Sequence, residues 1–376
     1  MRIVHTITGL STGGAERALY NVLSGGLATR FESAVISLRD RGAFGERIEA
    51  LGVPVHALGI RHGIPGPAAL LRLRSLVREL RPDVVQGWMY HGNLAASVAA
   101  AMAPGRPAVA WNVRHSLYRL EDEKRSTQWV IRAGRKLSSR PDAIIYNSRL
   151  SRAQHEAFGF AAARGRVIPN GFDLASLGPD ADVRARMRQE LGIPDGATVV
   201  GHVARFHPMK DHAGFLRTAV AVAHSVPQTH FLVVGREVNP ENPALAGIVP
   251  PELLSRFHFP GERDNVPDYM RAMDLFCTSS AWGEAFPNVI GEAMATELPC
   301  VVTDVGDSKN IVDDTGVVVP PGDGKALESC LREMLQKDRG ERLAMGKAAR
   351  ARMAAEYALP KVVDAYEDLY QEIYPG

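Results

Sequence analysis

Short apolar runs alternate with amphipathic or alanine-rich stretches along most of the chain. The apolar runs occupy residues 2–7, 32–38, 53–58, 83–88, 108–113 and 143–148 in the first half, and 198–203, 230–235, 274–280 and 299–305 in the second. Such runs, bounded by turn residues, are typical of buried strands, and the stretches between them have the periodicity of helices. The pattern predicts an α/β protein built on doubly wound parallel sheets.

The alternation breaks once, in the segment IPNGFDLASLGPDADV, where proline, glycine and asparagine cluster. Such a cluster of turn residues predicts a linker between two Rossmann-like domains, residues 1–172 and 173–358. Pro360 predicts a break before a last helix, residues 359–376, which we expect to pack back on the first domain. Open α/β sheets bind ligands at the carboxyl ends of their strands, so the two domains are expected to face a ligand across a cleft.

The composition is that of a globular protein, and 376 residues suffice for two domains with separate cores. The chain shows neither the pattern of a signal peptide nor an apolar run of about eighteen residues. Cys277, Cys300 and Cys330 lack metal-ligand spacing and are expected to be buried thiols in a reducing compartment. These features predict a cytoplasmic protein.

Charge is distributed unevenly along the chain. Residues 1–173 carry 24 Lys and Arg against 13 Asp and Glu, a net charge of +11, whereas residues 174–376 carry 20 against 29, a net charge of −9. A basic first half predicts an anionic partner, such as a membrane surface or a charged ligand. Nucleic acid is not expected, because no nucleic-acid motif is present and aromatic residues are not interleaved with the cations.

The segment WGEAFPNVIGEAMA places Glu284 in a loop and Glu292 on the second turn of the helix that follows. Pro287 suits the first helical position, where a missing N–H costs nothing. The N–H groups near Asn288 and Val289 then form a site for phosphate at the positive end of the helix dipole. A phosphate site between two carboxylates matches a nucleotide sugar, which carries hydroxyl groups on both sides of its diphosphate. The alternative is a solvated loop glutamate and an ordinary helix former.

Two other loops carry candidate phosphate contacts. Gly13 and Gly14 open a helix after the first strand, where they would let the backbone approach a ligand closely, although a plain βα turn explains them equally well. Arg205 and Lys210 follow the first strand of the second half, where they would neutralise a diphosphate leaving group. Solvated surface cations are the alternative for this second pair.

The first half offers polar residues at the carboxyl ends of two strands. His91 and Asn93 follow the fourth strand, and Arg114 and His115 follow the fifth. A single histidine is more often structural than catalytic, but a position facing the cleft favours a functional role for His115. His91, Asn93 and Arg114 are candidates for contacts with an acceptor substrate.

The chain shows no convincing divalent-metal site. Asp180 and Asp182 resemble the DxD pattern of metal-bound nucleotides, but they come directly before a helical run. They are therefore interpreted as carboxylates at a helix start. We expect neither a metal nor a cofactor.

Together these motifs resemble family 4 of the retaining glycosyltransferases, which have the GT-B architecture of two Rossmann-like domains. The resemblance spans nearly the whole chain and rests on five motifs in the expected order, namely GGAER, PNGFD, ARFHPMKD, FPGERDNVPDYM and GEAFPNVIGEAM. Each motif is weak by itself, whereas five in order are specific.

The resemblance implies roles for the individual residues. Glu292 would bind the donor ribose, Glu284 the hydroxyls of the donor sugar, and Arg205 and Lys210 the diphosphate. His115 would contact the sugar or line the reacting face, and the segment PGERDN, which contains Arg263, would frame the base. The expected catalytic residues are Glu284, His115, Arg205 and Lys210. The expected donor-binding residues are Gly13, Gly14, Arg205, Lys210, Arg263, Glu284, Phe286, Pro287, Asn288, Val289 and Glu292.

The chain departs from the family pattern at four positions. Ala204, Asp211, Ala285 and Glu297 stand where the family often has glycine. These departures leave the charged residues in place, so they concern loop shape and sugar identity more than the reaction.

The expected reaction is transfer of a sugar from a nucleotide donor, a UDP-sugar, to a hydroxyl acceptor, with retention at the anomeric carbon. Three other interpretations remain open. A nicotinamide-dependent dehydrogenase would use the early glycines and Asp40 but would leave Glu284 and Lys210 without roles. A non-catalytic sugar-binding protein and a sugar-nucleotide epimerase are the other two.

Basic segments in the first half predict a location for the enzyme. In residues 67–81, Leu70, Leu73, Val77 and Leu80 recur at helical spacing among Arg72, Arg74, Arg78 and Arg81, and residues 123–140 add Trp129 beside further cations. Basic helices with an apolar face can bind an anionic membrane surface. The alternative is that the leucines cover the sheet and the arginines are solvated. A glycan or lipid-linked acceptor at the inner face of the cytoplasmic membrane, as in polysaccharide assembly, would explain the positive charge.

Overall fold

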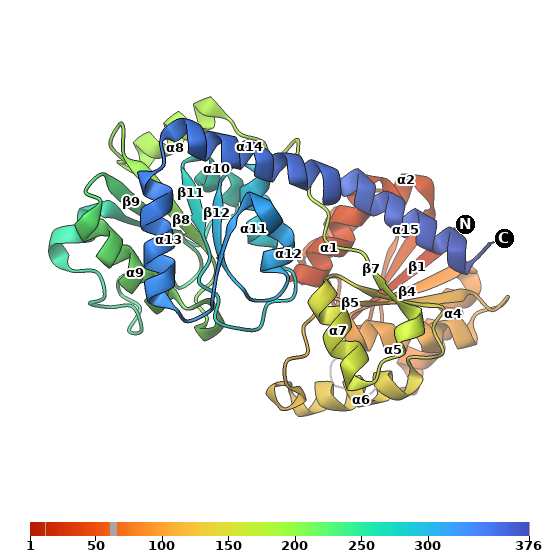
Figure 1. Cartoon of the computed structure of the whole chain (residues 1–376). Coiled ribbons are helices and arrows are strands. Elements are labelled where there is room, and N and C mark those ends of the chain that lie inside the picture. The colour runs from red at the N-terminus through yellow and green to blue at the C-terminus, as the bar shows by residue number, and fades with distance from the viewer. Residues whose placement is uncertain (12, 61–65, 376) are drawn as a thin grey trace. The chain divides into compact units, whose positions relative to one another are not determined.

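The computed structural model describes residues 1–11, 13–60 and 66–375. The chain divides into two compact units, which we describe separately (Figure 1). Unit 1 is Met1–Gly171 together with Tyr357–Gly376, and unit 2 is Phe172–Glu356. The chain therefore enters unit 2 within the turn-rich segment singled out above and returns to unit 1 for its last helix.

Unit 1 contains a parallel sheet in the strand order β3-β2-β1-β4-β5-β6-β7. Its strands are β1 Arg2–Ile7, β2 Glu32–Ser37, β3 Val55–Ala57, β4 Val84–Trp88, β5 Ala108–Val113, β6 Ala143–Tyr146 and β7 Gly165–Val167. Its helices are α1 Gly14–Val22, α2 Ala28–Arg30, α3 Gly42–Glu49, α4 Pro67–Leu80, α5 Met89–Met102, α6 Arg125–Leu137, α7 Arg149–Phe158 and α15 Leu359–Ile373.

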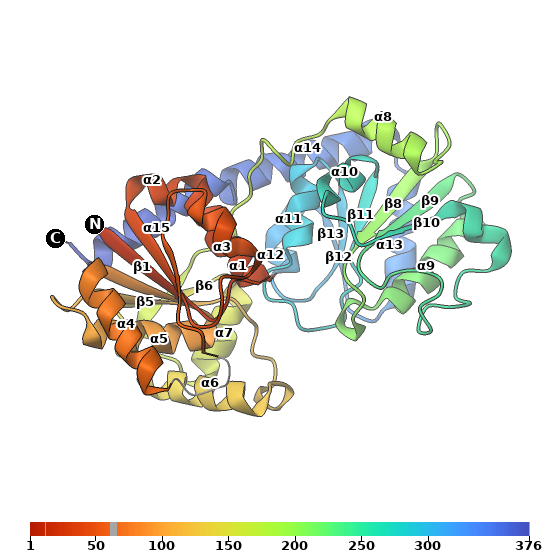
Figure 2. The same ribbon diagram turned by 180° about the vertical axis from the view of Figure 1, so that it is seen from behind.

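The sheet of unit 1 is buried on both faces, which explains why its strands are almost continuously apolar. Side chains alternate along β1: Ile3 and Ile7 belong to a core formed with α1, α3 and α15, whereas Val4 belongs to a core formed with α4 and α5. Figure 2 shows the sheet between these two sets of helices. This layering is the predicted doubly wound arrangement.

Helix α15 completes unit 1 although it comes last in the chain. Its Tyr366 hydroxyl accepts a hydrogen bond from Nδ2 of Asn112 at 2.8 Å, and its Tyr370 hydroxyl donates to Gln86 Oε1 at 2.6 Å. Leu359 packs against glycine, since a Cβ added at Gly25 would lie 2.6 Å from Leu359. The packing of this helix on the first domain follows from its six buried side chains, Leu359, Val362, Val363, Tyr366, Leu369 and Tyr370.

The apolar stripe of α4 covers the sheet and is not available to a membrane. Leu73 and Val77 are buried in the core beside β1 and β2, and Leu80 packs against the same core. The exposed side of the helix carries Leu71 and the arginines. Within the described ranges, no helix has the length and apolarity needed to cross a membrane.

Unit 2 contains a parallel sheet in the strand order β10-β9-β8-β11-β12-β13. Its strands are β8 Thr198–Val203, β9 Thr229–Val234, β10 Phe257–Gly261, β11 Leu275–Cys277, β12 Cys300–Thr303 and β13 Val317–Val319. Its helices are α8 Ala181–Glu190, α9 His212–Ser225, α10 Val266–Arg271, α11 Asn288–Ala295, α12 Ser308–Val312, α13 Gly324–Gln336 and α14 Arg339–Glu356. Helices α9 and α13 pack together over one face of this sheet.

Three strands escaped the sequence pattern: β7, β10 and β13. All three lie at an edge of their sheet. β7 and β13 are short, and β10 contains Pro260, which lacks a donor N–H. A strand of three residues is too short to show periodicity, so β7 and β13 were missed although β13 consists of three valines.

Two local predictions can be checked directly. Asp180 caps α8, because its carboxylate accepts hydrogen bonds from the N–H groups of Asp182 and Val183 at 3.0 and 2.9 Å, so the helix-start interpretation is confirmed. Cys277 and Cys300 are buried, and burial raises the pKa of both thiols. The expectation of a buried thiol is wrong for Cys330, which is only partly buried at the edge of its core.

Buried histidines should make the stability of unit 1 depend on pH. Burial lowers the pKa of His5 to about 3 and that of His155 to about 4. Below about pH 6.5 the unfolded chain binds protons that the folded unit excludes, so stability is complete above that pH and decreases below it. We expect the free energy of unfolding in urea to fall by roughly 1–2 kcal/mol per histidine between pH 7 and pH 5. His155→Gln should flatten this dependence, and an unchanged slope would contradict the assignment.

Candidate active site

The central feature of unit 2 is an ion pair between Lys210 and Glu284. Lys210 ends a single helical turn, Pro208–Lys210, after β8, and Glu284 lies in the loop after β11. The Lys210 ammonium contacts Oε1 of Glu284, and the two side chains are only 18% and 11% exposed. Because β8 and β11 are paired and parallel, their carboxyl ends meet at one edge, which brings together two residues far apart in the sequence.

Hydrogen bonds hold the loops that carry this ion pair. The Ser280 hydroxyl donates to Oε1 of Glu284 at 2.9 Å. The N–H of Ala281 donates to the Met209 carbonyl oxygen at 2.7 Å, which ties the two loops together through their backbones. These bonds fix the two loops relative to each other and orient the Glu284 carboxylate.

Gly306 is required by the same loop, and the sequence analysis did not single it out. Its φ is +66°, and a Cβ added to it would lie 2.8 Å from the Cβ of Glu284 and 2.9 Å from the carbonyl oxygen of Ala285. The N–H of Asp307 donates to that same Ala285 carbonyl at 2.9 Å. The pair Gly306–Asp307 after a strand is a turn signal, but the close contact with Glu284 appears only in the folded unit.

Helix α11 begins directly behind Glu284. Pro287 is its N-cap and Asn288 its first residue, so the helix starts one position later than predicted. Glu292 lies on the second turn, as expected. Phe286 is buried and its ring lies 6.2 Å from that of Phe172, so this side chain packs in the interior. The start of a helix carries the positive end of the helix dipole, which makes this terminus suited to an anion.

Arg205 and Arg263 lie on two loops at the carboxyl edge of this sheet, and β9 separates the strands that these loops follow. Both side chains belong to exposed residues, Arg205 after β8 and Arg263 after β10. Arg263 donates from Nε to the Tyr269 hydroxyl at 2.9 Å and from a terminal nitrogen to the Glu262 carbonyl at 3.1 Å. The carboxyl edge of this sheet thus carries two arginines as well as the pair of Lys210 and Glu284.

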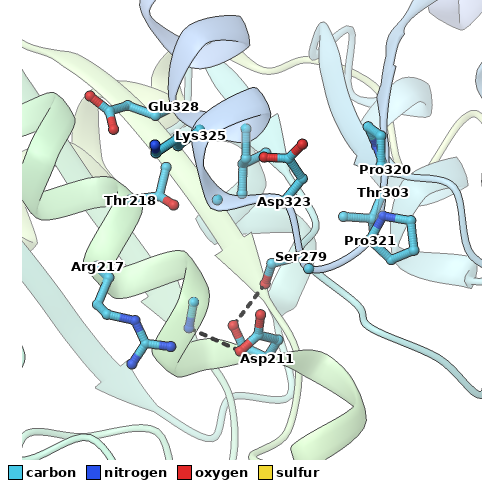
Figure 3. A pocket seen from close by; sticks show the side chains of 14 residues that line it. Asp211, Arg217, Thr218, Ser279, Thr303, Pro320, Pro321, Asp323, Lys325 and Glu328 are labelled. Carbon is cyan, nitrogen blue, oxygen red and sulfur yellow. Dashed lines mark hydrogen bonds between the residues drawn. The ribbon is translucent and has the colours of Figure 1, made fainter.

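A cavity of about 630 Å³ lies beside the loop that bears Lys210, between α9 and α13 (Figure 3). Asp211 and Ser279 line it together with Arg217, Lys325 and other residues of these helices. The described residues that line it include none of the predicted site residues. The cavity is therefore a neighbour of the predicted site and does not coincide with it.

In unit 1, His115 is paired with Glu123. Nε2 of His115 lies 2.6 Å from Oε1 of Glu123, and the Ser151 hydroxyl donates to the His115 carbonyl at 2.7 Å. The hydrogen bond from His115 lowers the pKa of the Glu123 carboxyl group, although burial opposes this shift. Sequence reasoning missed Glu123, which contacts His115 across a loop.

The acceptor candidates have different surroundings. Asn93 is 2% exposed, and its amide bonds the backbone of Asn112, so this side chain is engaged in the interior of unit 1. Arg114 contacts the side chains of Asn170 and Asn112 and lies over the Trp88 ring, which ties it to the interior of unit 1. His91 is half-buried, and burial together with nearby Arg39 lowers its pKa.

The glycines of the first loop lie at the start of α1. Gly13 is the N-cap and Gly14 the first helical residue. A Cβ added at Gly14 would meet no heavy atom within 4 Å, whereas one added at Gly13 would contact the carboxylate of Glu16. Gly14 thus leaves open space beside a helix start. The described part of the chain contains no cluster of three or more His, Cys, Asp or Glu residues that would hold a metal ion.

Two family models match the chain, one in each half. The model described as Glycosyltransferase Family 4 matches residues 12–176, and the model described as Glycosyl transferases group 1 matches residues 197–337.

Individual relatives agree with these matches. The lipopolysaccharide core biosynthesis mannosyltransferase LpsB of Rhizobium meliloti is 26% identical, over 86% of this chain and 90% of that protein. A UDP-Gal:alpha-D-GlcNAc-diphosphoundecaprenol alpha-1,3-galactosyltransferase of Escherichia coli is 24% identical, over 80% of this chain and 78% of that protein. The crystal structure of Anabaena Alr3699/HepE in complex with UDP has a TM-score of 0.86 and 23% identity, and covers 99% of this chain and 100% of that one.

Two Rossmann-like units with parallel sheets, both matched by glycosyltransferase models, define this protein as a glycosyltransferase with the GT-B fold. Residues 12–176 match the model of glycosyltransferase family 4, the family that the order of motifs in the sequence suggested. The dehydrogenase, epimerase and sugar-binding interpretations are not favoured.

Replacing Gly306 should displace Glu284 and thereby slow glycosyl transfer. In Gly306→Ala the new methyl group pushes against the Glu284 backbone, and we expect the rate of glycosyl transfer to fall at least about tenfold, because small displacements of a positioned group are costly. Gly322→Ala is a matched control, since Gly322 has a φ of +75° but no heavy atom within 4 Å of an added Cβ. If the rate of transfer falls equally in both variants, backbone strain alone explains the effect and the displacement of Glu284 does not.

Proposed function

We propose that this enzyme is a retaining, metal-independent glycosyltransferase that uses a nucleotide-sugar donor, specifically a UDP-sugar. The observation that carries this proposal is the pair of Lys210 and Glu284 at the sheet edge in front of α11. A cation, a carboxylate and a helix N-terminus at one edge suit a diphosphate joined to a sugar. Arg205 and Arg263, on two loops of the same sheet edge, add positive charge for the diphosphate and a frame for the base.

Stabilisation of the leaving group is the main catalytic task in this proposal. As the bond between the anomeric carbon and the diphosphate oxygen breaks, negative charge builds on the diphosphate, and Arg205, Lys210 and the amides of α11 stabilise it. The acceptor oxygen forms its bond to the anomeric carbon on the same face, and its proton passes to the leaving phosphate. Glu284 and Glu292 bind the hydroxyls of the sugar and the ribose.

Support for the donor comes from the relatives. The Anabaena protein has been solved with UDP and with UDP-glucose, and the Escherichia coli enzyme takes its name from UDP-Gal. A GDP-sugar is the second candidate, because one of the relatives is a GDP-mannose-dependent mannosyltransferase of Mycolicibacterium smegmatis. His115, paired with Glu123, is the unit 1 residue that we assign to the reacting sugar.

We assign the acceptor to unit 1 and propose that it is lipid-linked. The relatives named for diphosphoundecaprenol and for phosphatidylinositol act on such acceptors by their names. The net charge of +11 on residues 1–173 suits an anionic surface. Since the apolar stripe of α4 is buried, we place the contact with the inner face of the cytoplasmic membrane on α6, where Trp129 is 72% exposed among Lys and Arg residues.

Charge removal tests the donor assignment. Lys210→Ala and Arg205→Ala should each lower turnover at least about tenfold, because each removes a cation from the charge that develops on the leaving diphosphate. Arg217→Ala is the matched control, since Arg217 is exposed on α9 of the same unit and lies outside the proposed site. Initial rates of nucleotide release with acceptor present measure the effect. Turnover within about threefold of wild type for Lys210→Ala would contradict the proposal.

The membrane proposal is tested with vesicles. Trp129→Ala should weaken sedimentation with anionic vesicles at low salt, because it removes an exposed aromatic ring that would enter the interface. Leu343→Ala, which truncates an exposed leucine on α14 of unit 2, should bind vesicles as the wild type does. Negligible binding of the wild type to anionic and neutral vesicles alike would favour an acceptor in solution.

A further inference from the structure

Ser279 and Ser280 are adjacent buried residues in the segment between β11 and Glu284. The Ser279 hydroxyl lies 2.9 Å from the carbonyl oxygen of Lys210. It also lies 3.1 Å from the carbonyl oxygen of Asp211 (Figure 3). The Ser280 hydroxyl instead donates to the Glu284 carboxylate at 2.9 Å. The two hydroxyls thus act on different parts of the site.

The two serines follow β11 directly, and their hydroxyls have different partners. Ser279 contacts backbone carbonyls of the loop after β8, whereas Ser280 contacts a carboxylate of its own loop. The backbone of the segment is fixed from two sides, because the Thr303 hydroxyl donates to the Ser280 carbonyl at 2.7 Å and the Ala281 N–H donates to the Met209 carbonyl at 2.7 Å. Each serine is therefore held in one direction.

The donors to Oε1 of Glu284 include the charged Lys210 and the neutral Ser280. In the function proposed above, Lys210 turns to the diphosphate when the donor binds. The Ser280 hydroxyl then remains to orient the carboxylate toward the sugar. Ser279 has no contact of this kind with Glu284 among the described residues, and it fixes the backbone from which Lys210 reaches the diphosphate.

We propose that Ser280 is a positioning residue for the donor sugar, acting through Glu284, and that Ser279 is a positioning residue for the diphosphate, acting through the Lys210 backbone. The assignment rests on the proposed function of this site. It makes the two hydroxyls separable by ligand: free nucleoside diphosphate reaches Lys210 but has no sugar for Glu284 to bind, whereas the nucleotide sugar contacts both residues.

The test is titration calorimetry of the full chain with a nucleoside diphosphate and with its sugar conjugate. The sugar conjugate is the one that the wild type hydrolyses fastest among UDP-glucose, UDP-galactose and GDP-mannose, and the diphosphate is the matching UDP or GDP. Ser280→Ala should weaken binding of the nucleotide sugar about tenfold and leave diphosphate binding within about twofold, the size expected for a hydrogen bond to a charged group. Ser279→Ala should weaken the binding of the diphosphate and of the nucleotide sugar by a similar factor.

Thr229→Val is the control for loss of a buried hydroxyl in the same unit. Thr229 is fully buried at the start of β9, and its hydroxyl has no hydrogen-bond partner in the described structure, so this variant should bind both ligands as the wild type does. If Ser280→Ala weakens the binding of the diphosphate and of the nucleotide sugar equally, or weakens the binding of neither, the separate role of Ser280 is wrong. If the wild type binds and hydrolyses none of the nucleotides, the proposed function itself is wrong, which is a different result from any serine phenotype.

Discussion

The contact between Lys210 and Glu284 is the interaction on which the site of unit 2 depends. A largely buried ion pair seldom stabilises a fold, because removing two charges from water costs about as much as their attraction returns. This one is retained where two loops meet at the carboxyl edge of a parallel sheet, with Ser280 on the same carboxylate. Its value is therefore better explained by the geometry it provides for a charged ligand than by stability.

The surrounding loops are built to keep that geometry. Gly306 lets its loop approach Glu284 closely. Gly235 likewise allows close approach to the loop that carries Lys210, since a Cβ at Gly235 would contact the Ala204 carbonyl oxygen. His212 adds a hydrogen bond to that carbonyl at 3.1 Å, and burial lowers the pKa of His212 to about 4, so it stays neutral beside Lys210 at neutral pH. Rigid supports of this kind are what a site needs when it must stabilise developing charge without reorganising.

Unit 1 obeys a different constraint, the burial of both faces of its sheet. The helices between Met1 and Gly171 do not complete this cover, and α15 supplies the rest from the far end of the chain. Two tyrosines of α15 bond polar groups of β4 and β5, so the helix also satisfies groups that would otherwise be buried without partners. The position of Pro360 in the first turn of α15 separates it from α14.

Local patterns in the sequence determined the main strands, the break between the units, the cap at Asp180 and the loop position of Glu284. These features depend on residues near one another in the chain, and so do the family motifs. Tertiary structure alone decided the rest. The sequence could not show that Ser280 and Gly306 support Glu284, that Glu123 pairs with His115, or that Asn93 is turned into the interior. It also could not decide whether the leucines of α4 face a sheet or a membrane, because both environments select the same helical stripe. Such facts depend on which strands become neighbours, and neighbouring strands are set by packing between distant segments.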